Sequence, residues 1–152
     1  MRSLAQILLP AGLMVFTAGW VASDNPPQAQ SFVDYCAYVG SNLTDHWLGL
    51  FCRNNMTAVF GYNYTWIDLD LCIGNNGGQL IPYDNGNYST SCTNCSFVAI
   101  PKKTITLSCL CQDENKQIFN SSLDLNTTLY DDNGSAGCFG HSGNKTLDYP
   151  NP

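Results

Sequence analysis

The clearest periodic pattern in the chain is a short-range alternation of apolar and polar residues. It is present over residues 67–71 and 105–109, where every second side chain is apolar or a cysteine. Residues two apart face the same side of a β-strand, so both stretches predict half-buried strands. Strong turn signals occur at Gly77-Gly78, Asn85-Gly86 and Asn133-Gly134. Because no helical period is sustained over three turns, the pattern predicts an all-β protein of short strands and hairpins.

One longer apolar run stands apart at the start of the chain. Residues 4–21 are predominantly apolar, follow the basic Arg2, and lead into the small residues Ala22 and Ser23. This is the pattern of a secretory signal peptide. A membrane anchor is the alternative, since the run approaches the length that spans a bilayer, but no basic stop-transfer flank follows it. We expect a signal peptide over residues 1–23, a leader over 24–30, and a secreted, extracellular product.

The rest of the chain contains an internal repeat with an offset of 56 residues. Residues 32–36 (FVDYC) match residues 88–92 (YSTSC), and residues 67–80 match residues 123–136. An offset that is kept at both ends indicates duplication of one structural unit. We therefore predict one domain over residues 31–138, composed of repeat 1 (31–86) and repeat 2 (87–138). A C-terminal tail over residues 139–152 would follow it.

All eight cysteines lie after the apolar run, and an even number in a small secreted chain predicts four disulfides. A zinc site and a redox-active C-x-x-C are the alternatives, but neither histidine has finger-like spacing and no strand-to-helix turn is apparent. Each repeat has one cysteine near its start and one at the end of its second strand. Repeat 2 has two additional cysteines, Cys95 and Cys109, which lie just inside Cys92 and Cys111. The expected bridges are Cys36–Cys52, Cys92–Cys111 and Cys95–Cys109, and Cys72 and Cys138 remain near the ends of the two repeats.

Charge and composition narrow the functional classes. The chain has twelve acidic and six basic residues, a net charge of −6, and many Asn, Ser, Thr, Gly and Tyr residues. An acidic secreted protein is a poor candidate for nucleic-acid or anionic membrane binding. Asp68, Asp70 and Asp124 offer carboxylates for glycoside hydrolysis, but they lie at repeated strand and turn positions where capping explains them. We expect no enzymatic activity, no cofactor and no metal.

Together these features resemble the cyanovirin-N homology (CVNH) domain family, and the extra cysteines resemble those of its secreted fungal members. The resemblance covers about residues 31–138. It rests on the aromatic–x3–Cys opening, the L-x-x-x-C second strand, the hydrophobic–Asp–Leu–Asp/Asn stretch, and I-x-N-x-x-G at Ile73, Asn75 and Gly78. It implies an all-β, pseudo-twofold fold of two tandem repeats that exchange strands, with three-stranded sheets, β-hairpins and disulfide staples. Exchanged strands permit a monomer or a domain-swapped dimer.

The resemblance also implies a lectin that binds oligosaccharides or glycoproteins, specifically α1,2-linked mannose of mannose-rich glycans, through one or two shallow pockets. The first pocket would consist of Asn75, Asn87, Thr90, Ser91, Gln112, Asp113 and Glu114. The second would consist of Ser31, Asp34, Tyr35, Arg53, Asn54, Asn55, Asp131, Asp132 and Asn133. Two departures from the family predict a shifted specificity or the loss of one pocket: acidic Asp113-Glu114, and Asp131 where Asn is usual. Ordinary turn chemistry is the alternative explanation of all these residues.

Many possible glycosylation sites complicate the surface. Sequons occur at Asn42, Asn55, Asn63, Asn87, Asn94, Asn120, Asn126, Asn133 and Asn144. A glycan on Asn87 or Asn133 would lie over an implied pocket. The alternative function is therefore a secreted structural, interaction or effector protein that has kept the scaffold without sugar binding.

Overall fold

The computed structural model describes residues 30–54, 61–100 and 103–146, and it confirms an all-β protein. The predicted signal peptide, most of the predicted leader, and the last residues of the predicted tail lie outside the described residues. In the described part of the chain, no helix is long and apolar enough to cross a membrane. The elements are β1 (Gln30–Ser31), α1 (Phe32–Tyr35), β2 (Cys36–Thr44), β3 (Trp47–Arg53), β4 (Tyr62–Asp68), η1 (Leu69–Leu71), β5 (Ile73–Asn76), β6 (Gln79–Pro82), η2 (Tyr88–Thr90), β7 (Cys92–Ile100), β8 (Thr104–Gln112), β9 (Ile118–Asp124), η3 (Leu125–Thr127), β10 (Tyr130–Asp131), β11 (Ala136–Cys138) and β12 (His141–Ser142).

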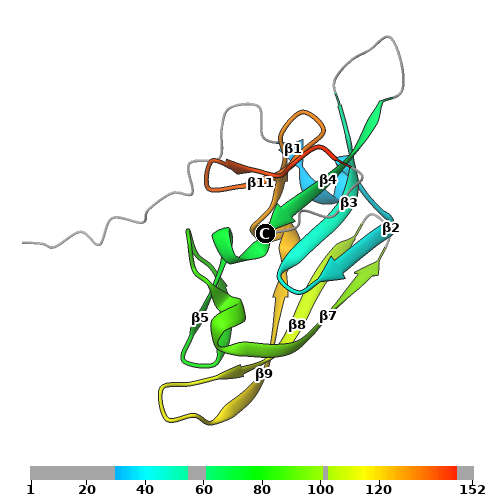
Figure 1. Ribbon diagram of the computed structural model, residues 1–152. Coiled ribbons are helices and arrows are strands. Elements are labelled where there is room, and N and C mark those ends of the chain that lie inside the picture. The colour runs from blue at the N-terminus through cyan, green and yellow to red at the C-terminus, as the bar shows by residue number, and fades with distance from the viewer. Residues whose placement is uncertain (1–29, 55–60, 101–102, 147–152) are drawn as a thin grey trace, which may run out of the picture.

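Two three-stranded antiparallel sheets, one from each repeat, form the centre of the molecule (Figure 1). Strands β2-β3-β4 make the first sheet and β7-β8-β9 make the second. Their registers correspond, because Trp47 pairs with Asp68 in the first sheet as Thr106 pairs with Asp124 in the second. Each first strand also has an irregularity in its register soon after its opening cysteine. The repeat seen in the sequence is therefore a repeat of backbone structure.

A short 3-10 turn follows each sheet, and the same side-chain contact starts both turns. The Asp68 carboxylate accepts a hydrogen bond from the Asp70 N–H, and the Asp124 carboxylate accepts one from the Asn126 N–H. A short acidic side chain at this position satisfies a backbone donor that the turn itself leaves unpaired. The repeated aspartates at positions 68 and 124 are thus explained by capping.

The two halves exchange elements, as the sequence predicts. The β5-β6 hairpin of repeat 1 packs against β9 of repeat 2, where the Leu80 N–H donates to the buried Ser121 hydroxyl at 2.8 Å. In the reverse direction, β10 and β11 of repeat 2 join β1, and β11 contacts β4. There the buried Thr65 and Ser135 hydroxyls are hydrogen bonded at 3.1 Å. Neither repeat completes its half alone, which follows from the small apolar area that so short a unit can bury.

Pairing continues beyond Cys138, the predicted end of the second repeat. Strand β12 pairs with β11, and the backbone of Asn144 forms hydrogen bonds with Trp66 in β4. Residues 141–144 therefore belong to the same packed unit as the sheets.

The hydrophobic core crosses the boundary between the repeats. Strand β8 illustrates how it forms, because Ile105, Leu107, Cys109 and Cys111 are buried and the residues between them are not. Leu48, Leu50 and Ile67 contribute from the first sheet, and Leu69 and Leu125 from the two 3-10 turns. Each fully buried aliphatic side chain of this kind contributes roughly 1.5–3 kcal/mol.

Four disulfides close this core: the three expected pairs and a fourth between the two remaining cysteines. Cys36–Cys52 and Cys92–Cys111 join the first two strands of each sheet, and Cys95–Cys109 lies inside the second of these. Cys72–Cys138 links positions 66 residues apart and ties repeat 1 to repeat 2. No described cysteine is free, so neither a zinc thiolate site nor a redox dithiol is formed.

Candidate functional site

Asn75 is the central residue of the first predicted pocket. It lies near the end of β5, before the Gly77-Gly78 turn, and its Oδ1 accepts a hydrogen bond from the Gly78 N–H at 2.9 Å. Its Nδ2 donates to the Ser91 hydroxyl at 2.8 Å and to the Gln112 carbonyl at 2.7 Å. One amide side chain therefore fixes the β5-β6 hairpin of repeat 1 to the start of β7 and the end of β8.

The structure brings the predicted residues Asn75, Ser91 and Gln112 together through this amide. Asn87 lies beside them, because its backbone forms an isolated bridge with Gly74. Thr90 is held against Asn87, whose carbonyl accepts from the Thr90 hydroxyl at 2.8 Å. All five residues are at least partly exposed, so their remaining polar groups are available to a ligand.

A surface depression of about 380 Å³ adjoins Asn75. It is lined by Gly74, Asn75, Asn76, Ile81, Tyr83 and Gly86. Gly86 makes the close backbone approach possible, because a Cβ there would collide with the Ile73 carbonyl and the Gly74 backbone. Tyr83 is 59% exposed and presents an aromatic ring beside the depression. An aromatic face with neighbouring amide and backbone groups is suited to a polyhydroxylated ligand.

Asp113, predicted in the same pocket, has a local structural role. Its carboxylate accepts hydrogen bonds from the Asn115 and Gln117 backbone N–H groups, each at 2.8 Å. These contacts close the β8-β9 hairpin, so turn chemistry explains Asp113. Its neighbour Glu114 is exposed at the tip of this hairpin.

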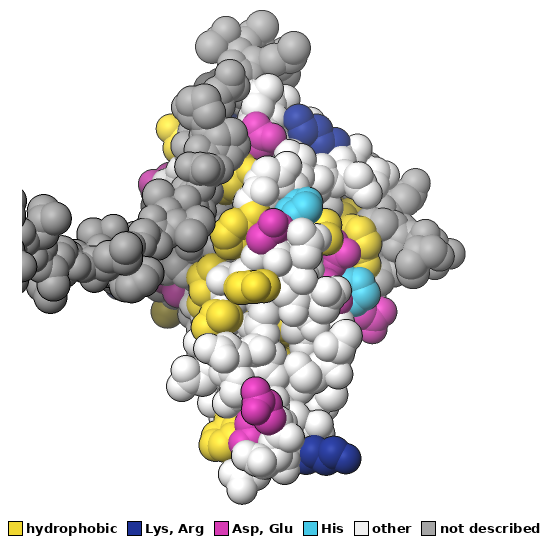
Figure 2. All heavy atoms as spheres, turned by 90° about the vertical axis from the view of Figure 1, so that its left-hand side faces the viewer, with side chains coloured by type: hydrophobic (Ala, Val, Ile, Leu, Met, Phe, Trp, Pro, Cys, Tyr) yellow, Lys and Arg dark blue, Asp and Glu magenta, His cyan; other side chains and the backbone are white. Residues whose placement is uncertain are grey.

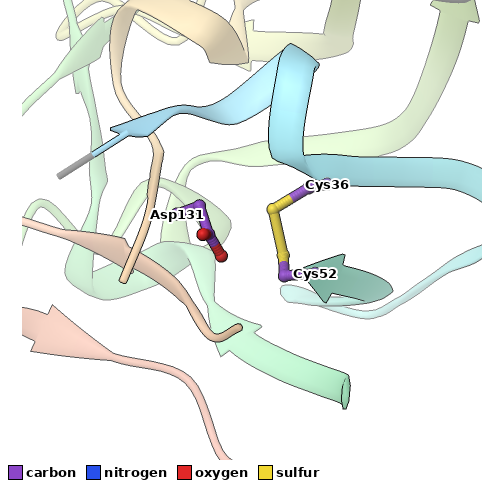
Figure 3. A group of neighbouring side chains, drawn as sticks. All are labelled: Cys36, Cys52 and Asp131. Carbon is purple, nitrogen blue, oxygen red and sulfur yellow. A yellow bond between two sulfur atoms is a disulfide. The ribbon is translucent and has the colours of Figure 1, made fainter. Parts of the chain in front are cut away.

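Asp131 occupies the position of Asn75 in the second predicted pocket. Its Oδ1 accepts from the Gly134 N–H at 3.0 Å, just as Asn75 accepts from Gly78. The residue is fully buried beside the Cys36–Cys52 disulfide (Figure 3), and its Oδ2 has no hydrogen-bond partner among the described residues. Burial raises the pKa of Asp131 to about 6, an effect that the Gly134 N–H partly opposes. A carboxylate here has no N–H to donate, whereas the Asn75 amide donates twice.

The other members of the second predicted pocket are spread around Asp131. Asp34, Arg53 and Asn133 are exposed, and Tyr35 is partly buried. Asn54 is also partly buried, and a Cβ added at Gly134 would meet its side chain. No amide corresponding to Asn75 joins these residues, because position 131 carries a carboxylate. Asn55 lies outside the described residues.

Comparison with known proteins decides the family. The model of the CVNH domain family matches residues 32–136. The protein belongs to the CVNH family. No curated protein sequence matched the chain significantly.

The CVNH fold is also found in solved structures. GzCVNH from Gibberella zeae is 19% identical, covers 72% of this chain and 98% of its own, and has a TM-score of 0.61. Microvirin, solved with mannobiose, is 18% identical with 72% and 98% coverage and a TM-score of 0.58. A MoCVNH3 variant, solved with (N-GlcNAc)4, is 15% identical with 74% and 99% coverage and a TM-score of 0.59. At these identities the comparisons establish the shared fold.

Sequence reasoning about this CVNH domain missed two groups that line its depression. Ile81 lies in β6 and Tyr83 in the loop after it, and both line the depression with Asn75. The available signal was an aromatic residue between the end of the strand and the Asn85-Gly86 turn. Asn87 and Asn133, both sequon residues, are exposed and adopt the left-handed backbone conformation.

One group of potential metal ligands in the CVNH domain is excluded by its chemistry. The Cys36 and Cys52 sulfurs and the Asp131 carboxylate lie within 4.8 Å of one another. Both sulfurs are committed to a disulfide and offer no thiolate.

Proposed function

We propose that this CVNH protein is a carbohydrate-binding lectin and that its main sugar site is the depression at Asn75. The observation that carries the proposal is the fixed Asn75 amide, which joins the β5-β6 hairpin to Ser91 and Gln112 and also lines an open depression beside an exposed Tyr83. Sugar hydroxyls need several preorganised neutral donors and acceptors, and a ring face adds apolar contact with the C–H side of the sugar.

The surface composition supports this proposal. On the face in Figure 2, neutral side chains and backbone cover most of the surface, and charged side chains are few and separated. Such a surface offers little to nucleic acids or anionic ligands. Catalysis is not required to explain the carboxylates of the 3-10 turns, since Asp68 and Asp124 serve as caps.

We propose terminal mannose of the α1,2-linked type as the ligand class. The family resemblance and the mannobiose complex of microvirin support this choice. The (N-GlcNAc)4 complex of the MoCVNH3 variant makes chitin-type oligosaccharides the appropriate competing ligand in a test. We propose further that the Asp131 pocket has lost this function, because its central amide is replaced by a carboxylate.

Secretion is part of the same proposal. Four disulfides are typical of proteins that mature in an oxidising compartment, and the apolar run at residues 4–21 has the pattern of a signal peptide. Mass spectrometry of protein collected from culture medium tests this point. A mature chain beginning at Asp24 is expected, and retention of residues 1–23 contradicts it.

Sugar binding is tested by a glycan array, followed by calorimetry with α1,2-mannobiose and with (GlcNAc)4 as competing ligand. Tyr83→Ala removes the exposed ring and should weaken mannobiose binding about tenfold, equivalent to about 1.4 kcal/mol. The matched control is Tyr62→Ala, because Tyr62 is a similarly exposed tyrosine, at 53%, in β4. Absence of any glycan binding by the folded, oxidised protein refutes the lectin proposal and favours the alternative of a secreted interaction protein.

A further inference from the structure

A second polar cluster lies outside both predicted sugar pockets, at the turn between β2 and β3. His46 lies in this turn, with Nε2 3.9 Å from Asp68 Oδ1 and Nδ1 3.8 Å from Asp70 Oδ2. The three residues each offer one ligand atom within 4.8 Å of the others. The side chains of His46, Asp68 and Asp70 are 31%, 20% and 13% exposed, so the cluster is sheltered yet reachable from solvent.

The corresponding cluster in repeat 2 lacks two of these three groups. The register of the two sheets places Ile105 at the position of His46, and the repeat offset places Asn126 at the position of Asp70. Repeat 2 makes the corresponding backbone contact without a charge at this position. The Asn126 Oδ1 accepts from the Val33 N–H, just as the Asp70 Oδ1 accepts from the Ser89 N–H. The neutral amide in repeat 2 therefore performs the same structural task.

A buried hydroxyl is a third difference between the repeats. Tyr88 corresponds to Phe32, and both rings are buried in the core. Tyr88 is only 1% exposed, and its hydroxyl has no hydrogen-bond partner among the described residues. Tyr88 lines the same surface depression as His46, and its chain neighbour Ser89 donates to the Asp70 carboxylate. An unpaired buried hydroxyl is costly and indicates a missing partner at this place.

An open depression lies beside the cluster and reaches it at His46. It has a volume of about 380 Å³, and its lining includes Asp45, His46, Tyr88, Ser89 and Asn94. His46 and Ser89 line the depression and also contact the Asp70 carboxylate.

We propose that His46, Asp68 and Asp70 form a binding site for a divalent transition-metal ion, with Zn²⁺ as the ion of best fit. Zinc takes histidine nitrogen and carboxylate oxygen ligands at about 2.0–2.2 Å. Only one ring nitrogen of His46 can ligate a given ion, and one nitrogen of the ring and one oxygen of each carboxylate lie within 4.8 Å of one another. Tetrahedral geometry at that bond length puts ligand atoms about 3.4 Å apart, so binding requires side-chain rotations that bring both carboxylates to the same ring nitrogen.

The carboxylates are already held by contacts of the kind that support metal ligands. Asp70 accepts from the Ser89 N–H at 2.9 Å and from the Ser89 hydroxyl at 2.5 Å, and Asp68 accepts from the Asp70 N–H. Such outer contacts fix the orientation of ligating carboxylates and reduce the conformational freedom lost on binding. A metal site at this cluster would contradict the expectation, drawn from the sequence, that the protein binds no metal. Metal binding here would be independent of sugar binding.

The test is a titration of the untagged mature protein with ZnCl₂, followed by calorimetry and by NMR of the histidine rings. The chain contains only two histidines, which makes the ring signals easy to assign. His141 is the comparison histidine, because it contacts the exposed Asp84 carboxylate at 2.8 Å and its effect on the pKa of Asp68 is smaller than that of His46. We expect one zinc ion per chain and a shift of the His46 ring signals.

Two substitutions separate ligation from folding. Asp70→Asn introduces the residue that repeat 2 already carries, and His46→Ala removes the nitrogen ligand from a turn. Each should weaken zinc binding by about tenfold or more, whereas His141→Ala removes no ligand and should change zinc binding far less. The proposal is overturned if the folded protein takes up no zinc at millimolar concentration, or if Asp70→Asn and His46→Ala both bind zinc like the unaltered protein.

Discussion

Asp131→Asn should stabilise the protein at neutral pH. Asp131 is fully buried, its Oδ1 accepts from Gly134, and its Oδ2 has no partner among the described residues. The equivalent Asn75 satisfies both ends of its amide in the same backbone framework. One of the groups that accept from the Asn75 amide is the Gln112 carbonyl. Arg53 follows Cys52 just as Gln112 follows Cys111, so the Arg53 carbonyl is the corresponding acceptor in the other half. The amide of an asparagine at position 131 would therefore find an acceptor where the carboxylate finds none.

The magnitude follows from the pKa. A pKa of about 6 in the folded protein, against an ordinary value of 3.8, means that the folded state binds this proton more tightly than the unfolded chain does. Stability contributed at this position is therefore present at low pH and is lost as the pH rises from about 4 to about 6. The loss amounts to about 3 kcal/mol at neutral pH as an upper figure.

The assay is guanidinium denaturation with the disulfides intact, at pH 3.5 and pH 7.5. Asp131→Asn should raise the free energy of unfolding by up to about 3 kcal/mol at pH 7.5 and change it little at pH 3.5. The control is the exposed Asp34→Asn, which should stay within about 0.5 kcal/mol of the unaltered protein at both values. An equal effect of Asp131→Asn at the two pH values, or destabilisation at pH 7.5, would refute the reasoning.

Two further predictions concern the exchange of elements between the repeats. Ser121→Ala removes the hydroxyl that accepts from the β6 backbone, so thermal or guanidinium denaturation should show a loss of about 1–2 kcal/mol; an unchanged midpoint would mean that this contact does not hold the hairpin. Replacing Cys72 and Cys138 by serine opens a loop of 66 residues and should cost up to about 4 kcal/mol. Replacing Cys95 and Cys109 should cost less, because another bridge already closes the same hairpin. A larger loss of unfolding free energy for the Cys95 and Cys109 variant than for the Cys72 and Cys138 variant, in the same denaturation assay, would contradict the account.

Much of the fold was predictable because local patterns and the repeat agreed. Alternation over residues 105–109 marked the buried face of β8, and the turn signals marked the hairpins. The offset of 56 residues placed Asp124 and the bridge Cys92–Cys111 by analogy with the first repeat. Such features depend on short-range geometry, which the sequence carries directly.

The sites were less predictable because they depend on which groups meet in space. Asn75, Ser91 and Gln112 were named correctly as neighbours, but the hydrogen bonds that join them depend on how the hairpin of repeat 1 packs on repeat 2. Tyr83 has no distinctive spacing, and its place in the depression depends on the close approach at Gly86. The histidine and carboxylates of the metal cluster come from segments more than twenty residues apart in the sequence.

The most direct test of the central claim is an NMR titration of ¹⁵N-labelled protein with α1,2-mannobiose. The account predicts saturable shifts of the backbone amides around Asn75, including Gly78 and Ser91, and small or no shifts around Asp131 and Gly134. Shifts confined to the Asp131 side would contradict the assignment of the working pocket. No shifts anywhere, from a sample whose four disulfides are confirmed, would contradict mannose recognition itself.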